Sequence, residues 1–194
     1  MPKNYVLIDY ENVQPDSISA LDRDDVHILI FMGASQTKVN VEIAMLAQKM
    51  GARAEYIKIC GNGNNALDFH IAYYLGELTN SDPKGYFHIV SKDTGFDPLI
   101  QYLTDKKIKV CRSKAIADIP ILQRQSATEN KTLLVIERLA KVGSSKPRTM
   151  KTLGSTINAL FNKELSEKEI TAIINDLKKA RVLEINQSKV NYLK

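Results

Sequence analysis

The sequence has few cysteines, no tryptophan and no long apolar stretch. Its 194 residues include two cysteines, Cys60 and Cys111, too few for the disulfide framework of a small secreted protein. No apolar run approaches the roughly 20 residues that a membrane-spanning helix needs. Residues 1–4 lead directly into a strand pattern and show no signal-peptide features. We therefore expect a reduced, cytoplasmic protein with no membrane partner.

Basic charge is concentrated in the last third of the chain. Residues 1–127 contain 14 Lys and Arg against 15 Asp and Glu, a net charge of −1. Residues 128–194 contain 13 basic and 7 acidic residues, a net charge of +6, and the two parts sum to the +5 of the chain. This asymmetry favours a polyanion as the partner of the second part. The alternative is a lysine-rich surface that only keeps the protein soluble.

Short apolar runs alternate with helical spacing over the first 115 residues. The expected strands are residues 5–8, 27–32, 54–59, 86–90 and 107–111, and the expected helices are residues 39–50, 66–78 and the stretch from 98 to 104. Strands that alternate with helices at this spacing predict an α/β fold, in which a parallel sheet forms the middle of three layers.

Acidic residues stand where the predicted strands end. Asp9 directly follows the first strand, and Asp93 and Asp97 follow the fourth. Asp68 lies in the first turn of the helix that leaves the third strand. Ligands of parallel sheets bind beyond the carboxyl ends of the strands, so all four belong to one edge. If strands one and four are neighbours, these four aspartates converge.

Carboxylates held this close together repel one another and need a cation. Hard divalent ions with oxygen ligands, Mg²⁺ or Mn²⁺, suit such a set. A site of this kind activates water and stabilises the charge that develops on a phosphate during displacement. The aspartates therefore predict metal-dependent hydrolysis of phosphodiester bonds.

Three of the four aspartates also have a local structural interpretation. Asp97 precedes Pro98 and would be a good helix N-cap. Asp68 could simply favour the positive end of a helix dipole, and Asp93 could be a turn residue in Asp-Thr-Gly. Asp9 has no comparable local role, because it directly follows four apolar strand residues.

Two neighbours of Asp9 remain open between structural and functional roles. Glu11 could be a solvated loop residue or a further ligand. Asn12 could cap the next turn or hold Asp9 in place.

A glycine-rich loop offers a competing interpretation. Residues 61–66, Gly-Asn-Gly-Asn-Asn-Ala, fit a Gly-x-Gly-x-x-Ala dinucleotide-binding loop. That loop normally follows the first strand of its unit and has an acidic strand end about 20 residues later, and neither holds here. We expect the glycines to let the chain turn tightly beside Asp68, and no nucleotide cofactor. The three histidines show no zinc-ligand spacing.

The combination of motifs resembles the NYN branch of the PIN-like nucleases over residues 3–115. The resemblance rests on Val-Leu-Ile-Asp-Tyr-Glu-Asn-Val at residues 6–13, on Asp68 at a helix start, and on Ser-Lys-Asp-Thr-Gly-Phe-Asp at residues 91–97. One departure is Tyr10, since many members have glycine after the first aspartate.

The resemblance implies a Mg²⁺- or Mn²⁺-dependent ribonuclease that acts on single-stranded or structured RNA. The metal-binding carboxylates that it implies are Asp9, Asp68, Asp93 and Asp97. Asn12 would position Asp9 within the catalytic set, and Ser91 matches the polar residue at the end of the fourth strand.

The last part of the chain resembles a winged helix. Helices are expected at residues 128–142 and 149–161, and a third opens with a Ser166-x-x-Glu169 capping box before a hairpin at residues 182–193. Winged helices often bind nucleic acid, although many bind only proteins. The candidate phosphate contacts are Lys92 in the first part and Lys146, Arg148, Lys151, Lys178, Lys179, Arg181 and Lys189 in the second. The alternative for these cations is a solvated surface.

The sequence thus predicts two domains: a NYN/PIN-like nuclease domain over residues 1–125 and a small winged-helix-like domain over residues 126–194. The expected activity is metal-dependent endonucleolytic hydrolysis of RNA, with the basic domain binding nucleic acid. One alternative is a non-catalytic nucleic-acid-binding adaptor, and another is a DNA-cutting PIN-like nuclease, although no helical-arch insertion is visible. RNA is preferred to DNA as the substrate, and a homo-oligomer is left open.

Overall fold

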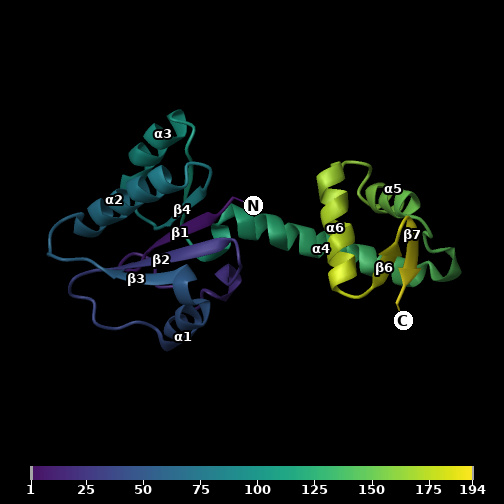
Figure 1. Ribbon diagram of the computed structural model, residues 1–194, viewed down its shortest axis with the longest axis horizontal. Coiled ribbons are helices and arrows are strands. Elements are labelled where there is room, and N and C mark those ends of the chain that lie inside the picture. The colour runs from purple at the N-terminus through teal and green to yellow at the C-terminus, as the bar shows by residue number, and fades with distance from the viewer. Residues whose placement is uncertain (1, 194) are drawn as a thin grey trace. The chain divides into compact units, whose positions relative to one another are not determined.

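A computed structural model describes residues 2–193, apart from the side chain of residue 144 (Figure 1). The chain divides into two compact units, one on each side of the peptide bond between Pro120 and Ile121. Each unit has its own hydrophobic core.

The first unit is built on a five-stranded sheet in which every neighbouring pair is parallel. The strand order is β3-β2-β1-β4-β5. The strands are β1 (Asn4–Asp9), β2 (Val26–Met32), β3 (Ala54–Lys58), β4 (Tyr86–Val90) and β5 (Lys109–Ser113). All residues of β1 are buried, as its continuous apolar run predicts for a central strand. The predicted parallel α/β sheet is confirmed.

Helices cover both faces of this sheet, which gives the three layers expected from the sequence. Figure 1 shows α2 (Ala66–Ser81) and α3 (Asp97–Asp105) on one face and α1 (Val41–Met50) on the other. The helix α2 buries Leu67, Ile71 and Leu75, which lie on one side of the helix because they are spaced by four residues. Short 3₁₀ turns complete the unit: η1 (Ser19–Leu21), η2 (Gly51–Arg53), η3 (Thr94–Phe96) and η4 (Ile116–Asp118).

The strands β1 and β4 are direct neighbours, with Ile8 opposite Val90. Their carboxyl ends therefore lie side by side, and Asp9 ends β1 where Ser91 follows β4. Successive strands are added on one side of β1 as far as β3, and β4 and β5 are then added on its other side. Such a switch point is where open parallel sheets bind ligands.

The fifth strand begins two positions later than its apolar pattern suggests. Lys107 has a φ of 64° and ends α3 in a left-handed turn. Its N–H donates to the Thr104 carbonyl at 2.8 Å, and the N–H of Ile108 donates to the Leu103 carbonyl at 3.0 Å. Lys107 and Ile108, the first two residues of the expected strand, therefore belong to the turn that ends α3. As a result, Arg112 lies inside β5 rather than after it.

The two cysteines are free. Cys60 follows β3 and Cys111 lies in β5, and these strands form opposite edges of the sheet. Within residues 2–193, no helix combines the length and the apolar character needed to cross a membrane.

The second unit contains three helices and a hairpin. Its elements are α4 (Pro120–Lys141), η5 (Gly143–Ser145), α5 (Met150–Leu160), α6 (Glu167–Lys179), β6 (Leu183–Asn186) and β7 (Lys189–Tyr192). The expected capping box at α6 is confirmed, since Ser166 Oγ accepts from the Glu169 N–H and Glu169 accepts from the Ser166 N–H. The helix α4 begins at Pro120, although the sequence predicts a start at Thr128. Residues 123–130 are polar and mostly exposed, so they show no apolar periodicity.

A short segment before α5 pairs with the hairpin of the second unit. Thr149 forms an antiparallel bridge with Lys189. The N–H of Val190 donates to the Arg148 carbonyl at 2.9 Å, and the N–H of Met150 donates to the Ser188 carbonyl at 2.9 Å. The segment around Thr149 thus lies beside β7 like a third short strand.

His88 is a buried histidine in the middle of the sheet, 4% exposed. Its Nε2 lies 3.1 Å from Asn4 Oδ1, and its Nδ1 lies 3.3 Å from Cys111 Sγ. Burial lowers the pKa of His88 from 6.5 to about 4.

We predict that His88 makes folding sensitive to acid. Between its folded pKa of about 4 and its unfolded pKa of 6.5, the unfolded state binds the extra proton. The stability that depends on neutral His88 is therefore fully present above pH 6.5 and is lost as the pH falls toward 4. The loss amounts to roughly 3 kcal/mol in the free energy of unfolding. Urea unfolding at several pH values should show this loss in the wild type and a smaller one in His88→Gln. Equal pH dependence in both proteins would contradict it.

Candidate active site

Asp9 is buried at the end of β1, with 3% of its surface exposed. Its Oδ1 accepts from the backbone N–H of Asn12 at 3.0 Å, and its Oδ2 accepts from Ser91 Oγ at 2.8 Å. Burial raises the pKa of Asp9, while the hydrogen bonds from Ser91, Asn12 and the Glu11 backbone oppose this rise. The carboxylate is thus held in one orientation by neutral donors.

Ser91 and Asn12 tie the ends of β1 and β4 together. Ser91 Oγ donates to Asp9 and accepts from the Asp93 N–H at 3.1 Å. The side chain of Asn12 accepts from the Lys92 N–H at 3.3 Å through its Oδ1. The contact of Asn12 with Asp9 is made by its backbone N–H, and its side chain contacts Lys92 instead.

Tyr10 follows Asp9 at the position where the resemblance leads us to expect glycine, and its side chain is buried. Its side chain is 3% exposed, and its hydroxyl accepts from the Asn40 N–H at 3.1 Å. Its carbonyl accepts from Gln36 Nε2 at 3.1 Å. The large ring is therefore buried away from Asp9, among residues that precede α1.

Asp93 is partly committed to local structure. It is the N-cap of η3, and its Oδ1 accepts from the Gly95 N–H at 2.8 Å. The turn role considered from the sequence is therefore present. Within residues 2–193, Asp93 Oδ2 accepts no hydrogen bond, so one oxygen is free to bind a ligand.

Asp97 is bound to an arginine rather than to its own helix. The N-cap of α3 is Phe96 and no side chain caps the helix, so the alternative interpretation of Asp97 as the helix cap is wrong. Both carboxylate oxygens accept from Arg112, Oδ1 from Nε at 2.7 Å and Oδ2 from Nη2 at 2.9 Å. Arg112 keeps the pKa of Asp97 low and also donates to the Ser91 carbonyl at 3.2 Å.

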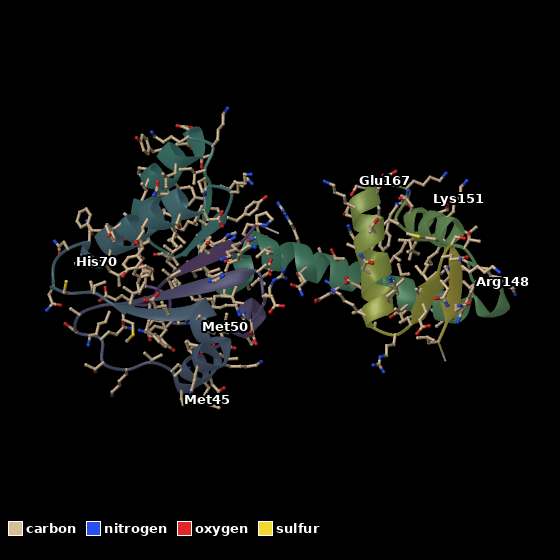
Figure 2. All side chains as sticks on the ribbon, viewed as in Figure 1. Met45, Met50, His70, Arg148, Lys151 and Glu167 are labelled. Carbon is tan, nitrogen blue, oxygen red and sulfur yellow. The ribbon has the colours of Figure 1, made fainter. Side chains whose placement is uncertain are left out.

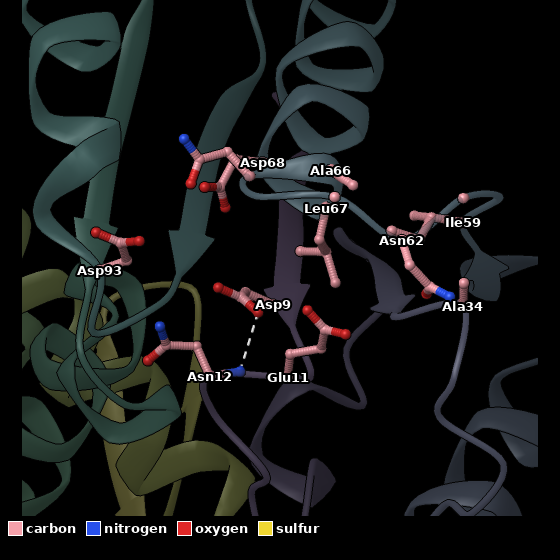
Figure 3. A pocket seen from close by; sticks show the side chains of 13 residues that line it. Asp9, Glu11, Asn12, Ala34, Ile59, Asn62, Ala66, Leu67, Asp68 and Asp93 are labelled. Atoms are coloured by element: carbon pink, nitrogen blue, oxygen red, sulfur yellow. Dashed lines mark hydrogen bonds between the residues drawn. The ribbon is translucent and has the colours of Figure 1, made fainter.

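A cavity of about 380 Å³ opens at the carboxyl edge of the sheet, and Figure 3 shows the carboxylates of Asp9, Glu11, Asp68 and Asp93 around it. Its other lining residues are Asn12, Ala34, Ile59, Gly61, Asn62, Gly63, Asn65, Ala66 and Leu67. Asp97 is not among them. The cavity is therefore lined by four carboxylates and three asparagines, and none of its lining residues is a lysine or an arginine.

The carboxylates of this cavity act on one another electrostatically. Asp68 is in the first turn of α2, and none of its neighbours in residues 2–193 donates a hydrogen bond to its side chain. Loss of hydration raises the pKa of Asp68, and the charges of Asp9, Asp93 and Glu11 raise it further. The cavity is thus a concentration of negative charge, and none of its lining residues supplies a cation.

Some residues of the site were not expected from the sequence. Asn62 and Asn65 belong to the loop between β3 and α2, where Gly61 has a φ of 85° and Asn65 a φ of 63°. The position of this loop at the carboxyl end of a parallel strand was the available signal. Arg112 gave no signal, because its pairing with Asp97 depends on the register of β5 against β4.

The chemistry of the cavity fits a hard divalent cation. Carboxylate and amide oxygens are its preferred ligands, and crowded carboxylates gain most from it. In the described part of the chain, no three Asp, Glu, His or Cys side chains stand close enough to hold an ion among them. Mg²⁺ commonly binds through one or two carboxylates and keeps several waters, which is compatible with this spacing.

A family model described as a PIN domain matches residues 3–113 of the chain. The match covers more than half of the sequence, and the chain belongs to the PIN domain family. PIN domains are generally metal-dependent nucleases, so the family implies a nucleic-acid substrate and a divalent metal ion. Comparisons with curated proteins and with solved structures give no significant match.

We predict that Asp68→Asn stabilises the metal-free protein. The raised pKa of Asp68 means that its charge opposes folding at neutral pH, so an uncharged isostere should raise the Tm of the metal-free protein. Mn²⁺ should raise the Tm of the wild type more than that of the variant. Glu77→Gln on the exposed side of α2 is the control. An Asp68→Asn variant that is less stable than the wild type would contradict the expectation.

Proposed function

We propose that the first unit is a Mg²⁺- or Mn²⁺-dependent endoribonuclease of the NYN branch. The observation that carries this proposal is the set of carboxylates around one cavity at the β1–β4 switch point, with no cation from the lining residues. Repulsion among these carboxylates destabilises the metal-free protein, and a bound divalent ion would relieve this repulsion.

Asp9, Asp68 and Asp93 would hold the ion, directly or through water, and the ion would supply an activated water and stabilise charge on the phosphate. The chain orients these groups: Ser91 and Asn12 hold Asp9, while η3 holds one oxygen of Asp93 and leaves the other free. The exposed side chain of Lys92 is next to Asp93 in sequence and is proposed to contact a substrate phosphate.

For Asp97 we propose a role other than direct binding of the ion. As a ligand it would have to leave Arg112, since both of its oxygens are occupied. We therefore propose that Asp97 serves the site mainly through Arg112, which binds the Ser91 carbonyl and so supports the residue that holds Asp9.

We propose that the second unit is a winged-helix-like domain that binds nucleic acid. Its three helices, its hairpin and the Thr149–Lys189 bridge agree with that topology. A groove of about 690 Å³ lies between the segment before α5 and β7, and its lining includes Lys146, Arg148 and Lys189. Lys146 Nζ lies 5.1 Å from the centre of the Tyr192 ring.

These three cations favour the groove as the phosphate-binding surface. Within residues 2–193 none of them forms an ion pair with an acidic side chain. Figure 2 shows Arg148 and Lys151 on the surface of this unit. By contrast, Lys178 and Lys179 lie in the last turn of α6, where a helix dipole alone favours cations, and Lys179 lies 4.0 Å from Asp176. The first turn of α6 is acidic, with Glu167 and Glu169, which disfavours its insertion into a DNA groove.

We predict that Asp93→Asn abolishes cleavage of labelled RNA in Mg²⁺ or Mn²⁺. Asparagine still caps η3, so the fold should persist while the free carboxylate oxygen is lost. The rate should fall at least 100-fold, and circular dichroism should be unchanged. Asp105→Asn at the exposed end of α3 is the control and should cut normally. Unchanged cutting by Asp93→Asn would exclude Asp93 from the site.

The same assay separates the alternatives. A wild type that cuts only DNA would support the DNA nuclease, and one that shifts nucleic acid on a gel without cutting would support the adaptor. Cleavage of a circular RNA would establish endonucleolytic action.

We predict that the groove determines the salt dependence of RNA binding. Each single-strand phosphate contact contributes roughly 0.7 to the slope of log affinity against log salt. Combined Lys146→Ala, Arg148→Ala and Lys189→Ala changes should therefore flatten the slope by about 2. The charge-matched control is Lys178→Ala, Lys179→Ala and Arg181→Ala, which should change it less. Equal effects of both triple variants would contradict a groove-centred site.

A further inference from the structure

The carboxylate of Glu11 lies in a space that exists because residue 33 is glycine. Gly33 directly follows β2, and a Cβ atom at this position would overlap Glu11 Oε1 and lie 2.5 Å from Cδ and 3.1 Å from Cγ. The φ of Gly33 is not among the positive values of the chain, so any residue could adopt its backbone conformation. Because these atoms are the far end of a flexible side chain, a Cβ at position 33 would displace the Glu11 carboxylate, and glycine leaves this space to it.

Glu11 is an exposed residue whose side chain lies at the edge of the acidic cavity. Within residues 2–193, no hydrogen bond or ion pair reaches the Glu11 side-chain oxygens. The side chain instead lines the acidic cavity, and its charge contributes to the raised pKa of Asp68. Figure 3 shows Glu11 on the side of Asp9 opposite Asp93, facing the same space as Asp9 and Asp68.

We propose that Glu11 is a further cation ligand of this site, bound directly or through water, and that Gly33 is the residue that positions it. The proposal rests on the proposed metal-dependent function. Glu11 extends the donor set past Asp9 toward the loop at residues 61–63, where Asn62 also lines the cavity. Together with Asp9, Asp68 and Asp93 it lines the cavity, and the spacing of these carboxylates leaves room for waters that bridge some of them to the ion.

A double-mutant cycle tests the proposal with Mn²⁺ alone, without RNA. Isothermal titration of the full-length wild type, Glu11→Ala, Gly33→Ala and the double variant gives the four affinities. Glu11→Ala should weaken Mn²⁺ binding about tenfold or more, as loss of a ligand or its support commonly does. Gly33→Ala should also weaken it, since the added methyl displaces the Glu11 carboxylate.

The cycle also predicts how the two changes combine. In the Glu11→Ala background the clash is absent, so Gly33→Ala should have little further effect, and the double variant should bind like Glu11→Ala. Gly76→Ala on α2, where a Cβ would meet nothing within 4 Å, is the matched glycine control and should bind normally. Glu11→Gln keeps the volume and removes the charge, so it should also bind weakly.

Each other outcome is informative. Wild-type affinity in Glu11→Ala or Glu11→Gln would overturn the ligand role and leave the metal site of Asp9, Asp68 and Asp93 intact. Strictly additive effects of Glu11→Ala and Gly33→Ala would overturn the positioning role of Gly33. If Gly33→Ala fails to fold, refolding of the double variant would support the packing of Glu11 against Gly33, and its failure would overturn it. A wild type that binds no Mn²⁺ would overturn the proposed metal-dependent function itself.

Discussion

The hydrogen bond from Ser91 Oγ to Asp9 Oδ2 joins the carboxyl ends of the two central strands, and the rest of the site depends on it. It holds a buried carboxylate in one orientation without neutralising it. Around this bond, Asn12 links the first turn to Lys92, and Arg112 links the Ser91 carbonyl to Asp97. A parallel sheet allows this arrangement because adjacent strands end at the same edge and leave their following residues free to point outward.

The cost of the arrangement is electrostatic. Asp9 and Asp68 both have raised pKa values, because hydration is lost and like charges lie nearby. Neutral donors reduce this cost only at Asp9 and at one oxygen of Asp93. A chain selected only for stability would not keep these charges together. Their presence in a PIN domain is consistent with binding a divalent ion, and the proposed roles of Glu11 and Gly33 follow the same reasoning.

Sequence patterns were most informative where one local rule decides the outcome. Buried apolar runs predicted the strands, and the capping box predicted the start of α6. They were less informative where two rules compete. At Lys107 a turn that ends α3 delays the start of β5. Residues 123–130 are helical as part of α4, although this stretch has no apolar periodicity from which a helix could be predicted. Asp97 precedes a proline and resembles a helix cap in the sequence, yet its partner is Arg112 in β5.

The sequence by itself determined that this chain contains a parallel α/β sheet, that aspartates stand at its carboxyl edge, and that positive charge is concentrated toward its C-terminus. These properties depend on periodicity, on residues at strand ends and on composition, which are all local. Only the tertiary structure decided which carboxylates line one cavity, because this depends on β1 lying beside β4 and on the register of β5. It also decided that Asp97 binds Arg112 and that Glu11 occupies the space left by Gly33, since both contacts join residues far apart in the chain.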